Sequence, residues 1–114
     1  MAEELFKDGK VSGVGEYLDG KRHGRWIFYF RNGQPKAKAG YSHGQLDGDC
    51  VWHREGGGPL QRGAFREGRQ DGFWRRWHST GELLDEGTYE VGRKVGEWVS
   101  YAPDGTEIKR RSYQ

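Results

Sequence analysis

The sequence has few of the aliphatic residues from which most globular proteins build their core. Leu, Ile, Val and Phe together number 19 of 114 residues, and apolar residues make up 32% of the chain. A content of Leu, Ile, Val and Phe below roughly 20% is unusual for a folded domain. So low a content is typical of disordered chains, but such chains are also highly charged and poor in aromatic residues. Here the formal net charge is only +2 and aromatic residues reach 14%, so we expect a folded protein.

Further absences exclude whole classes of protein. No apolar run approaches the roughly 18 residues of a membrane-spanning helix. The first residues lack the basic and apolar regions of a signal peptide, so we expect a cytoplasmic protein. The single cysteine, Cys50, excludes an internal disulfide and a multi-cysteine zinc site. Because 19 basic residues are balanced by 17 acidic ones, the chain lacks the positive excess typical of nucleic-acid binders, and we expect no nucleic-acid partner.

Glycine and aromatic residues are abundant instead, and they recur with a period of 24 residues from Leu5 to Ile108 without insertion or deletion. One set of glycine positions is Gly9, Gly33, Gly57, Gly81 and Gly105; others are Gly20, Gly44, Gly68 and Gly92, and Gly24, Gly48, Gly72 and Gly96. The aromatic positions are Tyr17, Tyr41, Phe65 and Tyr89; Trp26, Trp74 and Trp98 with Cys50 in the fourth place; and Tyr29, His53, Trp77 and Tyr101. A fixed period of this length predicts a repeated supersecondary unit.

Each unit reads as two short strands joined by tight turns. Asn32-Gly33 is a strong hairpin signal because such turns need positive φ. We expect the other turn between Gly20 and Gly24, centred near residue 22. The fold class is therefore all-β, an elongated, twisted antiparallel meander of 24-residue β-hairpin repeats. Residues 1–114 form one domain: 1–14 a half-repeat cap, 15–108 four repeats, and 109–114 a basic tail.

Strand alternation then predicts two stripes of side chains on opposite faces. The first is a ladder of Tyr17, Trp26, Tyr41, Cys50, Phe65, Trp74, Tyr89 and Trp98. The second consists of Leu5, Tyr29, His53, Trp77 and Tyr101, joined by Leu60, Leu84 and Ile108. Cys50 acts as a small filler in the ladder, so a tryptophan introduced there should be tolerated if the rung is vacant.

The unit Gly-x-Tyr-x-x-Gly-x-x-x-Gly-x-Trp-x-x-Tyr, followed by a turn glycine, resembles the MORN repeat (membrane occupation and recognition nexus). The 24-residue period is similar to the bacterial variant of the YwqK-like antitoxin family. The resemblance implies a MORN-type meander that serves as a scaffold, a lipid-proximal module or an interaction domain, with no catalytic residues. The second unit departs from the pattern at Cys50, His53 and the Gly56-Gly57-Gly58 run.

The residues show no constellation of an enzyme or a metal centre. Cys50 and His53 are three residues apart, so a strand places them on opposite faces and they cannot act together. Gly13-Val14-Gly15 lacks the following helix that a phosphate-binding loop requires. We therefore expect no enzyme, no catalytic residue, no cofactor and no metal.

Two features favour a binding function. The turns carrying Lys21, Arg22, Arg93 and Lys94 make one long edge weakly basic, either through ordinary solvation of loops or as a steering surface for an acidic partner or anionic lipid headgroups.

The second feature is a set of side chains in the middle repeats: Trp52, Phe73, Arg75 and Trp77. These side chains either cover the second face of the sheet or bind a partner. The sequence thus predicts a non-enzymatic protein–protein interaction module, a scaffold or an immunity or antitoxin-like protein whose partner is another protein chain such as a toxin or effector. The alternative is a membrane-surface module that binds anionic lipid.

Overall fold

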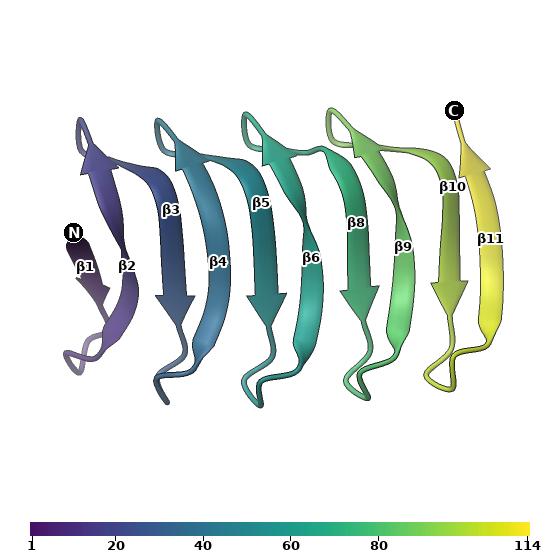
Figure 1. The fold of residues 1–114 in the computed structure, drawn as a ribbon, viewed down its shortest axis with the longest axis horizontal. Helices are drawn as coiled ribbons and strands as arrows, with labels where there is room; N and C mark the ends of the chain where they lie inside the picture. The colour runs from purple at the N-terminus through teal and green to yellow at the C-terminus, as the bar shows by residue number, and fades with distance from the viewer.

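The computed structural model describes residues 1–114 as one open antiparallel sheet without helices. Its strands lie side by side in chain order, from β1 at one end to β11 at the other (Figure 1); β7 pairs with β6 alone. The molecule measures 44 × 30 × 16 Å. The strands are β1 Ala2–Leu5, β2 Val11–Leu18, β3 Lys21–Tyr29, β4 Pro35–Ser42, β5 Gln45–His53, β6 Pro59–Arg66, β7 Arg69–Gln70, β8 Gly72–Trp77, β9 Leu83–Glu90, β10 Arg93–Tyr101 and β11 Glu107–Tyr113. The predicted all-β meander of hairpin repeats is confirmed.

The turns along the upper edge in Figure 1 are shorter than the sequence suggested. They are two-residue turns, and both residues of each have positive φ, as type I′ hairpins require: Asp19-Gly20, His43-Gly44, Glu67-Gly68 and Val91-Gly92. The prediction of a turn centred near residue 22 was wrong, because Leu18 already pairs with Lys21 across the hairpin. Gly24 lies inside β3 with a φ of 76° and forms an irregularity in the strand, not the end of a loop.

The turns along the lower edge follow the prediction. Gly33 has a φ of 86°, and its backbone N–H donates to the carbonyl of Phe30 at 2.9 Å. The Asn32 side chain accepts a hydrogen bond from the backbone N–H of Gln34 at 2.9 Å. The same arrangement recurs around Gly9 and Gly105, so Asx-Gly pairs support three of the lower turns.

Three tryptophans lie flat on the glycines of the preceding strand. A Cβ atom placed on Gly15 would come within 2.3 Å of the Trp26 indole, and one on Gly63 within 2.1 Å of Trp74. The indole N–H of Trp26 donates to the carbonyl of Glu16 at 3.0 Å, which satisfies the polar end of the buried ring. Trp98 lies on Gly87 in the same way.

The predicted ladder is confirmed by its ring contacts. Tyr17 packs edge-on against Trp26 with ring centroids 5.2 Å apart, and Trp74 lies between Phe65 at 5.2 Å and Tyr89 at 5.9 Å. The backbone register differs from the expectation that Tyr17 lies opposite Trp26 or its neighbour, since its Cα partner is Arg22. The side chains meet because the irregularity in the pairing shifts β3 against β2.

The second unit replaces both the tryptophan and the glycine that pack together in the other units. Cys50 stands where the others have tryptophan, and Ala39 stands where they have glycine. Both are buried, Cys50 at 0% and Ala39 at 2% exposure. The rung is therefore already filled, so the vacancy on which tolerance of a tryptophan at position 50 depends is absent.

Burial is confined almost entirely to one face, which we call the ladder face because it carries the ladder residues. Of the 12 buried residues, all except Val99 lie on it. We call the opposite side the open face. Residues 109–113, expected to form a basic tail, make up most of the outer strand β11. The structure holds no helix with the length and hydropathy needed to cross a bilayer.

Candidate interaction surface

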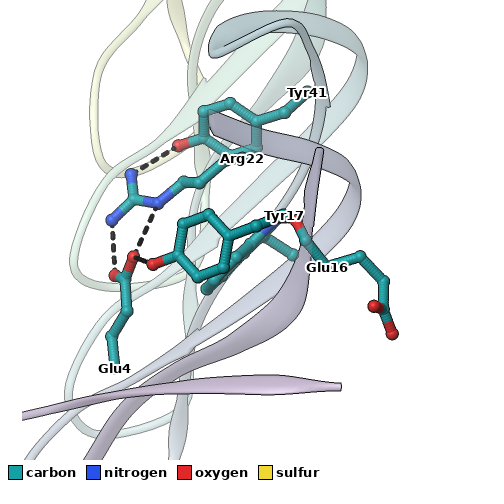
Figure 2. Close-up of polar contacts among 6 residues, drawn as sticks. Glu4, Glu16, Tyr17, Arg22 and Tyr41 are labelled. Atoms are coloured by element: carbon teal, nitrogen blue, oxygen red, sulfur yellow. Dashed lines mark hydrogen bonds and ion pairs between the residues drawn. The ribbon is translucent and has the colours of Figure 1, made fainter. Parts of the chain in front are cut away.

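Two ion-paired clusters lie on the ladder face. Arg22 lies at the centre of a cluster beside the first strand (Figure 2). Its guanidinium donates to the carboxylate of Glu4 through Nη2 at 2.5 Å and Nε at 3.1 Å, and to the hydroxyl of Tyr41 at 3.3 Å. The Tyr17 hydroxyl donates to the same carboxylate at 2.5 Å, whereas Glu16 points away from the cluster (Figure 2).

This cluster shifts the titration of its members. The hydrogen bond from Arg22 is the main reason that the pKa of Glu4 lies below its usual value, and it raises the pKa of Arg22 in turn. The pKa of Tyr17 is raised because its hydroxyl donates to the carboxylate of Glu4. The cluster ties β1 to β3 across β2, which gives it a structural role.

A second ion pair lies on the ladder face at the other end of the sheet. Arg76 donates to both carboxylate oxygens of Asp85, at 3.0 and 2.6 Å. Asp85 is only 6% exposed, and this hydrogen bonding raises the pKa of Arg76. A buried carboxylate needs such a partner, so this arginine is engaged in the fold.

The four basic residues predicted to form turns lie in strands and divide into two groups. Arg22 and Lys94 lie against rings of the ladder face, with the Lys94 ammonium 4.6 Å from the Trp98 ring centroid. Lys21 and Arg93 are exposed at the ends of their strands next to the turns. The expectation that these residues lie in the turns was wrong, because each turn ends before them and they begin strands β3 and β10.

Trp52 does not lie with the other three predicted surface residues. Its ring stacks on Trp74 with centroids 5.9 Å apart and meets Phe65 edge-on at 6.1 Å. It therefore belongs to the ladder face, together with Phe28, which stacks on Trp26. Residues two apart in a strand share a face, and this signal identifies both rings as ladder neighbours.

Strand alternation in β8 directs three side chains to the face opposite Trp74. The open face therefore carries Phe73, Arg75 and Trp77 together. Phe73 is 53% exposed, and the Arg75 guanidinium lies 5.2 Å from its ring centroid. Arg75 also donates through Nε to Glu86 at 2.9 Å. The backbone carbonyl of Trp77 accepts a hydrogen bond from Arg54.

The repeat columns show that these residues are specific to the third unit. The column of Phe73 is otherwise charged: Arg25, Asp49 and Glu97. The column of Arg75 is otherwise aliphatic: Ile27, Val51 and Val99. Phe73 thus replaces a charged residue and Arg75 an aliphatic one. In the other units both positions keep their usual residue types. The sequence contains this signal, but it acquires meaning only once both columns are known to face the same side.

Nothing in the structure assembles a reactive centre. Burial raises the pKa of the Cys50 thiol, which disfavours the reactive thiolate. Strand alternation places His53 on the other face. No group of three or more His, Cys, Asp or Glu side chains is placed to hold a metal ion.

Comparison with known proteins agrees with the fold. Residues 22–43 match the family described as MORN repeat variant, which supports a MORN-repeat protein. No curated protein matches the chain significantly. A chain in the crystal structure of the GtfA/B complex bound to UDP and GlcNAc is similar at 12% identity and a TM-score of 0.44. That alignment covers 97% of this chain and 26% of the other, so this chain spans about a quarter of its length.

Proposed function

We propose that this protein is a non-enzymatic protein–protein interaction module that binds its partner through the open face around Phe73, Arg75 and Trp77. The observation that carries the proposal is the asymmetry of the sheet. The ladder face carries the interlocked rings and 11 of the 12 buried residues, whereas on the open face Phe73 is 53% exposed beside the Arg75 guanidinium. Arginine and aromatic side chains of this kind dominate the affinity of protein interfaces.

The biological role follows from the partner. We propose an immunity or antitoxin-like protein, or a scaffold, whose partner is a toxin, an effector or a component of an assembly. The support is the resemblance of residues 22–43 to a repeat used for protein and lipid interactions. Mass spectrometry of proteins captured from the native host by the purified chain identifies the partner class.

The face is tested with the captured partner and three variants. Phe73→Ala and Trp77→Ala should accelerate dissociation about tenfold or more, since truncation of an interface anchor typically costs at least ~2 kcal/mol. Arg25→Ala is the matched control, because Arg25 is exposed in the same column as Phe73 but in the first unit. Unchanged dissociation for both β8 variants, with folds intact by circular dichroism, would exclude the open face as the binding surface.

One observation favours membrane-surface binding as a second candidate. Val91 is 60% exposed at the tip of a turn, and the exposed residues Lys21, Arg69 and Arg93 line the same edge of the sheet. Basic residues around an exposed apolar side chain suit an anionic bilayer surface. Co-sedimentation with phosphatidylserine vesicles that is lost on charge reversal of Lys21 and Arg93, but kept on Phe73→Ala, would support this candidate over the first.

A further inference from the structure

We infer that Arg62, Phe73 and Arg75 form a site for an acidic side chain of the partner protein, next to an apolar side chain that packs on Phe73. This inference rests on the interaction function proposed above and names the chemistry that the open face selects. It starts from two arginines whose position the fold does not explain.

Arg62 of β6 and Arg75 of β8 are direct cross-strand partners on the open face. Like charges directly opposite one another destabilise a sheet. The charge of Arg75 is offset by its ion pair with Glu86 at 2.9 Å. Arg62 is exposed and forms no ion pair, so one guanidinium of the pair has its hydrogen-bonding groups directed to solvent.

A hollow of about 450 Å³ lies beside these side chains. Small residues, Ala64 and Gly72, line it together with Arg62, Arg75, Phe73 and Asp49. Because the residues between the walls are small, a side chain of a partner can approach the backbone of the sheet there. One wall of the hollow is apolar and another carries guanidinium donors.

The unpaired Arg62 guanidinium gives the hollow a preference for a carboxylate. Guanidinium groups bind carboxylates with two parallel hydrogen bonds. Asp49 and Glu86 balance the two arginines, so the formal charge of the four groups is zero. A bound carboxylate can take both hydrogen bonds from Arg62 with one negative charge, whereas a phosphate dianion would bring a second negative charge next to Asp49 and Glu86. An Asp or Glu flanked by an apolar residue therefore fits better than a phosphate.

The test uses a peptide that presents this chemistry without a natural partner. The ¹⁵N-labelled full chain is titrated with acetyl-Gly-Leu-Glu-Leu-Gly-amide at millimolar concentration, and with the same peptide carrying Gln in place of Glu. We expect the Glu peptide to shift the amide signals of Ala64, Gly72 and Phe73 and the Nε–H signal of Arg62. The Gln peptide should bind about fivefold more weakly, as for the loss of an exposed ion pair, and the difference should shrink with added salt.

Two protein variants identify the responsible charge. Arg62→Gln should remove the preference for the Glu peptide. Lys38→Gln should keep it, because Lys38 is the exposed residue at the position of Arg62 in the preceding unit. Loss of the preference in both variants would mean that the positive charge of the open face as a whole causes the preference for the Glu peptide. That result would overturn the assignment to Arg62.

The remaining outcomes separate this inference from the proposed function. Equal binding of both peptides at Phe73 would overturn the carboxylate chemistry and leave the open face as an interaction surface. Stronger shifts with inorganic phosphate or phosphatidylserine vesicles than with the Glu peptide would overturn it in favour of a phosphate-bearing ligand. The absence of shifts with every probe would also overturn it, whereas the dissociation rates of the captured partner decide the proposed function independently.

Discussion

The filled rung of the ladder gives the sharpest test of how the repeat packs. In three units a tryptophan lies on a glycine, and in the second unit Cys50 lies beside Ala39. A Cβ atom at the glycine position comes within 2.1–2.3 Å of the indole in every unit that has a tryptophan. The two positions are therefore coupled by shape: tryptophan requires glycine, and alanine requires a small side chain.

The magnitudes follow from this geometry. Cys50→Trp alone should lower the free energy of unfolding by about 1–3 kcal/mol, because the Ala39 methyl group overlaps the new ring. Ala39→Gly alone should cost about 1–2 kcal/mol through chain entropy and a lost buried methyl group. The double variant restores the arrangement of the other units, so its stability should lie within about 1 kcal/mol of the parent, with a coupling of about 2 kcal/mol or more.

The assay is urea unfolding followed by far-ultraviolet circular dichroism, which does not depend on the added tryptophan. Ala37→Gly combined with Cys50→Trp is the matched control. Ala37 is also buried in β4 and on the ladder face, but it pairs with Trp52 and not with position 50. We expect its effect to be additive with that of Cys50→Trp. Additive losses in the Ala39→Gly, Cys50→Trp pair would refute the shape coupling.

Three other predictions concern single positions. Trp74→Ala removes a ring that is 3% exposed and should lower the free energy of unfolding by roughly 3–5 kcal/mol; a midpoint of urea unfolding equal to that of the parent would contradict the ladder packing. Val91→Asn should stabilise the fold by about 1 kcal/mol, since Val91 has a φ of 49°, a region that β-branched residues avoid and Asn tolerates; a lower melting temperature would argue against strain at this turn. Glu4→Gln should destabilise the protein at neutral pH, because the hydrogen bond from Arg22 lowers the pKa of Glu4 below its usual 4.5. That contribution is present above pH 4.5 and is lost as the pH falls through the lowered pKa, so the parent and variant should converge in acid; a difference that persists there would show that the ion pair is not its source.

Much of the architecture could be predicted from the sequence because a repeat of constant length transmits each local preference to every unit. Asn32-Gly33 favours its turn through the positive φ of Gly33 and the hydrogen bond accepted by Asn32, and Asp-Gly pairs do the same at Gly9 and Gly105. The ladder of Tyr17, Trp26 and their equivalents followed from strand alternation. Phe73, Arg75 and Trp77 do share one face, as strand alternation indicates, and their role in binding stays a prediction.

The rest depended on contacts that local preferences do not encode. Strand alternation from Cys50 places Trp52 on the ladder face, but its stacking on Trp74 depends on pairing with another hairpin. Arg22 appeared to belong to a solvated turn, but Glu4, brought alongside by β1, holds it against the rings.

The sequence by itself determined the strands, the lower turns and the order of the sheet, because period, glycine position and alternation act within one hairpin. Only the tertiary structure decided which face is covered. Large rings on one side lie flat on glycines of the preceding strand and exclude water there, while the opposite side has no such partners. That difference between the faces leaves Phe73 exposed beside Arg75, and it arises from packing between strands.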